Sequence, residues 1–188
     1  MGDKQVLWAR ALLACYKYLE PMCNIIDKQI NRVAQRSFYM STLWAEINSI
    51  ENVSSSIIDL SQEKISYINL KVLTENVLNL LKKDYAKVLI LKYVHKLKVT
   101  DICKVLCINE RTFYRKSEQA ILEFAKKMTK LGYNYEMLEV KYQSLSLISS
   151  VIKSVEKHTQ LNRNISLDDE EFFKSFFKCL RLNSKFNF

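Results

Sequence analysis

A short stretch in the middle of the chain carries the side chains best suited to chemistry. Arg111, Arg115 and Gln119 follow a Cys-Ile-Asn turn, and at about 100° per residue all three fall on one side of a helix. Arginine pairs with guanine and glutamine with adenine through two hydrogen bonds to the base edge. The opposite side of the same helix carries a predicted buried stripe: Phe113, Ser117, Ala120, Ile121, Phe124 and Met128. The stretch therefore predicts a helix that packs on the core through one side and contacts DNA bases with the opposite side.

Neighbouring side chains extend this predicted contact surface. Asn109 is a preferred N-cap residue and begins the helix. Lys98, Lys104 and Tyr114 are placed for phosphate contacts. Glu110 either pairs with a lysine or accepts a hydrogen bond from cytosine, and the sequence does not decide between them. The residues predicted to contact DNA are Lys98, Asn109, Glu110, Arg111, Thr112, Tyr114, Arg115, Lys116 and Gln119.

Each of these residues also has a plainer interpretation. Arg111 and Arg115 could be ordinary solvated cations on a helix surface, Gln119 could be a solvated polar residue, and Tyr114 could lie partly in the core. The distribution of charge favours the DNA interpretation. Residues 82–130 contain 13 Lys or Arg and 5 Asp or Glu, which gives a net charge of +8 out of +9 for the whole chain. A basic surplus confined to one folded segment is typical of a nucleic-acid-binding surface.

Metal binding and catalysis are not expected. Cys103 and Cys107 lie four residues apart with His95 upstream, but no further Cys or His nearby completes a tetrahedral zinc site. The five cysteines are an odd number in a chain that does not need disulfides, which suits the reducing cytoplasm. No catalytic constellation and no glycine-rich phosphate loop is found, so we expect no enzyme activity and no cofactor.

The composition predicts an all-α protein. Two glycines and one proline in 188 residues leave almost no material for the tight turns of a sheet, while the 48% apolar content can form a core. The apolar runs are interrupted every few residues, so we expect no membrane span. We predict three parts: a helical bundle at 1–81, a DNA-binding domain at 82–131 and a helical extension at 132–188.

The bundle at 1–81 is expected to bind a partner or a second copy of the chain. Its first helix should run over about 4–36, with a break or kink at Pro21. A second amphipathic stretch covers about 38–50, and 51–56 is expected to be a loop. The next helix, about 55–81, should bury one stripe that consists of Ile58, Ile65, Ile68, Val72, Leu73, Val77 and Leu80.

The remaining chain is also expected to be helical. Three helices are predicted in the middle part, at about 84–96, 99–107 and 109–128. The first two should bury Val88, Leu89, Leu91, Tyr93, Ile102, Cys103, Val105 and Leu106. A helix at 134–157 should follow, then a polar loop at 158–164. A last helix should start near Ser166 and present a face of four phenylalanines.

Residues 84–128 resemble the region 4 helix-turn-helix of bacterial sigma factors and of related phage late-gene activators. In that family an apolar helix ending in Leu-x-Tyr leads to a Leu-Ser-x-x-Glu-Ile-Ala helix, a Gly-Ile-Ser turn and a Thr-Val-x-Arg recognition helix. The corresponding stretches here are 91–93, 97–103, 107–109 and 112–115. The resemblance covers about a quarter of the chain, and it implies a helical bundle with a central helix-turn-helix.

The sequence departs from the family pattern at three positions. Lys98 stands where the family has a capping serine, Cys103 replaces a small alanine, and Cys107 replaces the turn glycine. Cys107 should therefore adopt a left-handed conformation at some cost in energy. No counterpart of the polymerase-binding region 2 is found, so the resemblance favours a DNA-binding transcription regulator of bacterial or phage origin over a sigma factor proper.

Double-stranded DNA is the partner that this interpretation implies, with RNA polymerase and a homodimer left open as further partners. Two alternatives remain: a sigma-like helical protein that acts through protein contacts, and a divergent sigma factor.

Overall fold

The structure, a computed structural model, describes residues 2–41 and 47–161, with side chains described for residues 2–35 and 51–156. Every regular element of these residues is a helix, which confirms the predicted all-α class for this part of the chain. None of these helices has the length and apolar character that a membrane crossing requires. In chain order they are α1 (Asp3–Ser41), α2 (Ile47–Asn79), α3 (Lys83–Leu89), the π-helix η1 (Ile90–Val94), α4 (Val99–Leu106), α5 (Glu110–Lys130), α6 (Tyr135–Tyr142) and α7 (Ser146–Leu161).

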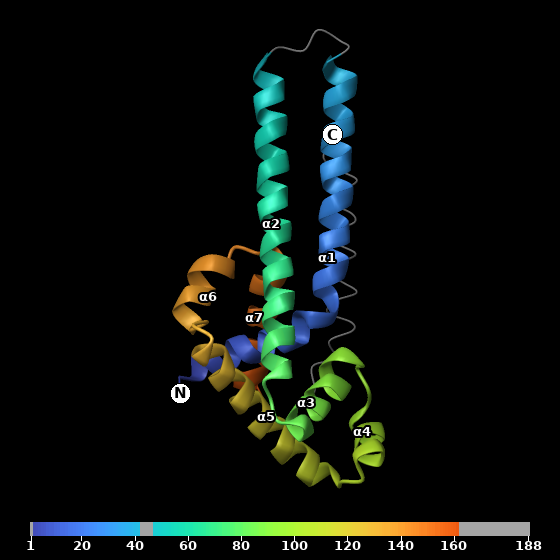
Figure 1. Cartoon of the computed structure of the whole chain (residues 1–188), viewed down its shortest axis with the longest axis vertical. Coiled ribbons are helices and arrows are strands. Elements are labelled where there is room, and N and C mark those ends of the chain that lie inside the picture. The colour runs from blue at the N-terminus through green and yellow to red at the C-terminus, as the bar shows by residue number, and fades with distance from the viewer. Residues whose placement is uncertain (1, 42–46, 162–188) are drawn as a thin grey trace.

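The two longest helices form an antiparallel hairpin that projects from the rest of the molecule (Figure 1). Pro21 lies inside α1, which continues through it as one helix. The helix changes direction along its length, so that its first part runs across the base of the hairpin (Figure 1). Proline removes one helical hydrogen bond and is a common cause of such a bend. The expected disruption is therefore a bend and not a break.

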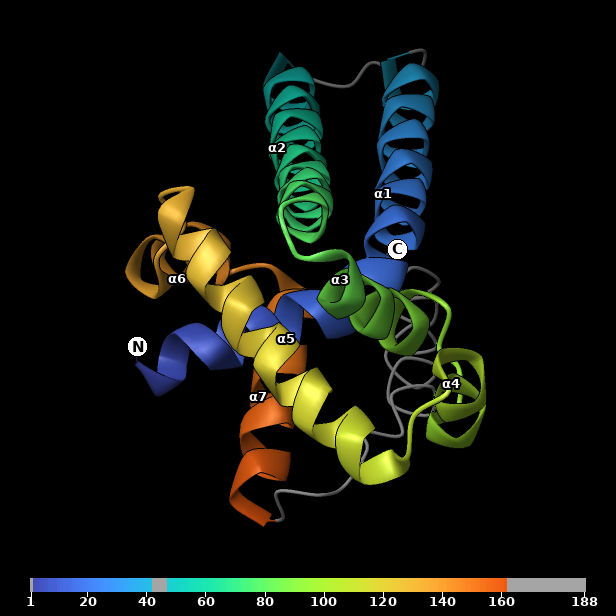
Figure 2. The same cartoon turned by 60° about the horizontal axis from the view of Figure 1, so that its bottom comes forward.

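One large core joins parts of the chain that are far apart in the sequence. It contains buried side chains from α1, α2, α3, η1, α5, α6 and α7, among them Trp8, Leu70, Leu89, Phe124 and Ile148. Figure 2 shows α5 crossing the first part of α1, on which α7 also packs. All three predicted parts of the chain contribute to this core. Their boundaries, at residues 81 and 131, fall in the short turns before α3 and after α5.

The hairpin differs from the sequence prediction in two respects. Residues 51–56 are helical, so the predicted loop is wrong and α2 begins at Ile47. The predicted buried stripe is also wrong: Leu73 and Val77 are buried, but the other five side chains are 41–66% exposed (Ile58, Ile65, Ile68, Val72 and Leu80). The face of α2 that packs into the core instead carries Tyr67, Leu70, Thr74 and Leu78.

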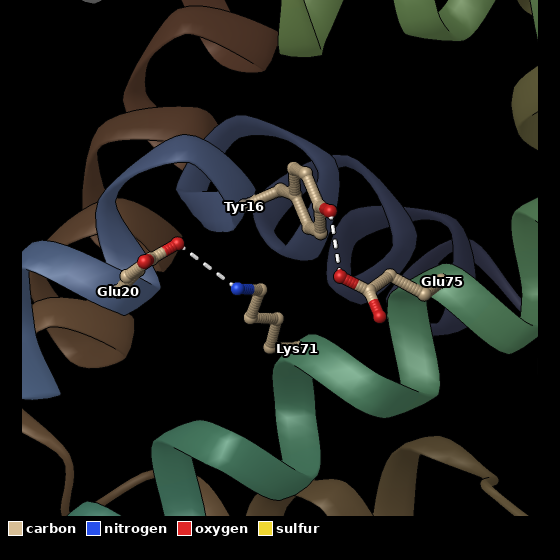
Figure 3. Close-up of polar contacts among 4 residues, drawn as sticks. All are labelled: Tyr16, Glu20, Lys71 and Glu75. Carbon is tan, nitrogen blue, oxygen red and sulfur yellow. Dashed lines mark hydrogen bonds and ion pairs between the residues drawn. The ribbon is translucent and has the colours of Figure 1, made fainter.

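Polar pairs between α1 and α2 explain which face of α2 turns inward. The Tyr16 hydroxyl donates to Glu75 Oε1 at 2.8 Å, and Lys71 Nζ lies 3.0 Å from Glu20 Oε2 (Figure 3). Further along the hairpin, Lys64 Nζ lies 2.6 Å from Asp27 Oδ1. Partly exposed pairs of this kind each contribute only about 0–1 kcal/mol, and together with the buried side chains they favour the observed rotation of α2 about its axis.

The segment after α5 also departs from expectation. The helix predicted at 134–157 is two helices, α6 and α7, separated at residues 143–145. Residues 158–161, predicted to begin a loop, belong to α7. The rest of that predicted loop and the last predicted helix, with its four phenylalanines, lie outside the described residues.

Candidate nucleic-acid interface

The segment before α4 is held by an irregular helix end. The predicted helix 84–96 consists of α3 followed by the π-helix η1, which ends at Val94. The His95 N–H donates to the Ile90 carbonyl at 2.9 Å, and Lys96 adopts a left-handed φ of 54°. Tyr93 is buried, as predicted, whereas Leu91, which was also predicted to be buried, is half-buried. This helix end directs the chain away from the main core and into α4.

The turn between α4 and α5 is closed by Cys107. This residue has φ 52° and ψ 44°, so the predicted left-handed conformation is confirmed. The Ile108 N–H donates to the Cys103 carbonyl at 3.1 Å, and the Cys107 N–H donates to the Lys104 carbonyl at 3.3 Å. These two bonds form the helix-ending arrangement that usually contains glycine. The turn is therefore tight, and it carries a residue that is poorly suited to its geometry.

The start of α5 matches the sequence prediction. The Asn109 side chain accepts a hydrogen bond from the Thr112 N–H at 2.8 Å, which confirms the predicted N-cap. All six residues of the predicted stripe are buried, from Phe113 to Met128, and the helix runs two residues further than expected, to Lys130. The anchoring of α5 from behind, on which the proposed contact surface depends, is thus present.

Two different cores hold the two halves of α5. A small core of Val88, Ile102 and Phe113 holds the first half against α3 and α4. Lys92 Nζ lies 5.9 Å from the centre of the Phe113 ring and covers this core from one side. The second half, with Ile121 and Phe124, packs in the main core. Val105, which was predicted to be buried, is 63% exposed because only Ile102 and its neighbours on one side of the short α4 face inward.

The predicted DNA-contacting side chains gather on the outer side of this arrangement. Arg111, Arg115 and Gln119 are exposed on α5, and within the described residues neither arginine forms an ion pair. Lys98, Asn109 and Glu110 are exposed as well, and Tyr114 is 47% exposed, whereas Thr112 and Lys116 are half-buried. Figures 1 and 2 both show α4 and the start of α5 at the end of the molecule away from the hairpin tip. Among the described residues, these side chains therefore lie at the surface of the molecule.

An ion pair that the sequence did not suggest removes one acidic charge from this face. Arg10 of α1 binds Glu118 of α5, 108 residues away in the sequence, through a short hydrogen-bonded contact. Glu123 is similarly paired with Lys126 at 2.7 Å, and this contact lowers the pKa of the Glu123 carboxyl. Pairing of Glu118 neutralises one carboxylate near Arg111 and Arg115, while the exposed Glu110 remains beside Arg111.

The cysteines near the turn are not arranged as metal ligands. Cys103 is half-buried, and desolvation, with a further contribution from the nearby Glu110, raises the pKa of its thiol. A raised pKa disfavours the thiolate form that binds metals. In residues 2–41 and 47–161, no three His, Cys, Asp or Glu side chains come together in a way that could hold a metal ion.

Residues 51–125 are similar to a family described as a protein of unknown function (DUF1492). The matched stretch runs from α2 through α3, η1 and α4 into α5, and it covers less than half of the chain. It therefore includes both the hairpin helix α2 and the candidate interface. No curated protein and no solved structure matches this chain.

Proposed function

We propose that α4, the turn at Cys107 and α5 form a helix-turn-helix that binds double-stranded DNA, and that the protein regulates transcription. The observation that carries this proposal is the placement of Arg111, Arg115 and Gln119. All three are exposed on the first half of α5, directly opposite a fully buried stripe. A recognition helix needs this division, because its N-terminal half enters the major groove while its back is held by the rest of the fold.

The dimensions of α5 suit this role. Arg111 and Arg115 are one turn apart, and Gln119 is one turn further, so the three side chains span about 12 Å along the helix axis. The major groove is about 12 Å wide and admits one α-helix. The guanidinium groups and the amide can therefore meet the edges of successive base pairs while α4 stays outside the groove.

The start of α4 supplies a second kind of contact. Lys98 is the exposed N-cap residue of α4, and its side chain makes no capping hydrogen bond. A phosphate at this position gains the lysine charge together with the N–H groups of the first helical turn. Lys98 and Tyr114 would thus hold the register of the protein on the DNA backbone, while α5 reads the bases.

The resemblance to region 4 of sigma factors agrees with this assignment. In the proposal, the protein is a sigma-like regulator that works in the bacterial or phage-infected cytoplasm, where transcription takes place. The three departures at Lys98, Cys103 and Cys107 leave the chain with an exposed N-cap lysine, a half-buried thiol and a left-handed turn residue. None of them covers the exposed face of α5.

The test is DNA binding by variants of single exposed cations. DNA fragments are first selected from a random pool with the wild-type protein, and affinities are then measured by fluorescence anisotropy. We expect Arg115→Ala to weaken binding to the selected site by about 1–3 kcal/mol and to relax base preference at one position. Lys98→Ala should weaken binding to all sequences alike and reduce the salt dependence by about one counterion.

Lys130→Ala is the matched control. Lys130 is an exposed cation on the same helix, about 22 Å along the axis from Arg115 and outside the proposed groove contact. Its replacement should leave the affinity unchanged. If Arg115→Ala and Lys130→Ala bind every selected fragment as tightly as the wild type does, α5 is not a recognition helix.

A further inference from the structure

The exposed side of α2 carries an apolar face that none of the described helices covers. Ile58, Ile65, Ile68, Val72 and Leu80 are 66%, 48%, 41%, 47% and 50% exposed. All five lie within about 60° of one line along the helix, opposite the side that packs on α1. Soluble monomers rarely expose this many aliphatic side chains along one side of a helix, so we infer that the face is an interaction surface.

The polar residues on this face are uncharged. From Ile58 to Leu80, the positions between the aliphatic side chains are serine, glutamine and asparagine, and they include Asn69, Asn76 and Asn79. The charged residues of this stretch, such as Glu63 and Lys71, lie on the flanks or on the side toward α1. A face without Lys or Arg does not suit DNA or an anionic membrane. The charge nearest to its centre is Glu75 at one edge, which accepts a hydrogen bond from Tyr16, so the face gives little repulsion against its own copy.

The spacing of the face fits a helix pair. Ile58, Ile65, Val72 and Asn79 are seven residues apart, as in the a positions of a coiled coil, and the d positions between them are Ser61, Ile68 and Glu75. A single asparagine at an a position, here Asn79, fixes the register of a helix pair. The pattern extends over about 32 Å of α2.

A hollow at the lower end of this face adds to its area. It has a volume of about 430 Å³ and lies between α2 and the segment after α5, where Leu80, Leu131 and Tyr133 line it. Leu131 is itself 43% exposed. The six half-exposed aliphatic side chains present on the order of 500 Å² per chain, so that two copies together reach the roughly 1,000 Å² expected of a specific interface.

We propose that this face binds a second copy of the chain, so that two α2 helices pair in parallel into a homodimer. Parallel pairing places both α4–α5 units at the same end of the paired hairpins. Two recognition helices at one end can meet two half-sites on one duplex, and this choice of orientation rests on the proposed DNA-binding function. The pairing itself depends only on the face of α2.

The test is the oligomeric state of the full chain without DNA, measured by sedimentation over a range of concentrations. We expect a reversible dimer for the wild type. The double variant Ile65→Asp/Val72→Asp should raise the dissociation constant by at least about 100-fold, because it sets like charges opposite each other. Both side chains are exposed in the single chain, so the helical circular dichroism of the variant should match that of the wild type.

Asn52→Asp is the matched control, because it puts the same charge on an exposed position of α2 about 140° away from Ile65. It should dimerise like the wild type. A wild type that stays monomeric at every concentration overturns the proposal, whether residues 162–188 or another protein occupies the face. Equal dissociation constants for the double variant and the wild type also overturn it.

Orientation is tested separately with Val72→Cys. In a parallel pair the two introduced thiols face each other within disulfide range, whereas Asn52→Cys places them outside the interface. Mild oxidation should therefore yield a covalent dimer for Val72→Cys in excess of that from the native cysteines. A dimeric protein that gives no such product is not a parallel α2 pair. Because none of these measurements uses DNA, loss of the dimer and loss of DNA recognition can be told apart.

Discussion

The strained turn at Cys107 gives a quantitative prediction for Cys107→Gly. A left-handed conformation costs an L-residue about 1–2 kcal/mol, and Cys107 has φ 52° and ψ 44°. Glycine removes this cost but adds about 0.4–1 kcal/mol of conformational entropy to the unfolded chain. The side chain contributes little that would be lost, since it is exposed and its Sγ makes one weak contact at 3.7 Å to the Lys104 carbonyl. We therefore expect a net gain in unfolding free energy of about 0.5–1 kcal/mol.

The assay is urea unfolding in reducing buffer, followed by helical circular dichroism. Cys107→Ala is the matched control, because it removes the thiol but keeps the Cβ atom that causes the strain. It should lie within about 0.5 kcal/mol of the wild type. Since the second half of α5 belongs to the main core, stabilisation of its first turn should appear in the global transition. If glycine is no more stable than alanine at this position, the strain assigned to the turn is absent.

Three further changes test other parts of the structure. Ser117→Ala should raise the unfolding free energy by about 1 kcal/mol, because the buried Ser117 hydroxyl has no hydrogen-bond partner among the described residues and alanine is the better helix former; a loss of stability in thermal unfolding would contradict this. Asn109→Ala should lower the unfolding free energy by about 1 kcal/mol, because it removes the N-cap of α5. Asn109→Ser keeps a capping oxygen and should leave the unfolding free energy unchanged. Burial and the hydrogen bond to Glu75 raise the pKa of Tyr16 from 10.0 to about 12, so its contribution to stability is complete below pH 10 and disappears as the pH rises through 12. Relative to Tyr16→Phe, the wild type should therefore lose unfolding free energy as the pH rises over this range. The measurement is urea unfolding of both proteins at pH 8, 9.5 and 11.5. A difference that stays constant would show that Tyr16 keeps an ordinary pKa.

The residues of α5 show what could be predicted from the sequence. Its cap at Asn109, its buried stripe and its exposed arginines all follow from local chemistry and from the helical repeat. The left-handed Cys107 was predicted on a different ground, because it stands where the turn glycine lies in the sigma region 4 pattern that this stretch resembles. These features depend on neighbouring positions, and periodicity describes neighbouring positions well.

The side of α2 that packs on α1 could not be predicted from the sequence. The helix has two apolar sides, and periodicity alone could not tell which of them packs on α1. That choice depends on pairs such as Tyr16 with Glu75 and Lys71 with Glu20, whose partners are 59 and 51 residues apart. The Arg10–Glu118 pair escaped prediction for the same reason.

The predicted loop at 51–56 failed because serine is ambiguous. Serine hydroxyls often favour turns, but in α2 the hydroxyl of Ser56 donates to the Asn52 carbonyl at 2.8 Å, four residues earlier. Ser66 and Thr74 make the same kind of bond further along the helix. A hydroxyl satisfied within the helix no longer competes with it, so the run of serines did not end α2.

The helix α5 connects the two hydrophobic cores rigidly. Its inner half packs against α1 and α2, its outer half presents Arg111 and Arg115, and a single uninterrupted helix joins them. Because α5 is continuous, a rigid-body shift of its inner half would also move these arginines. A fragment cut out around the turn would leave Phe124 and its neighbours without their packing partners.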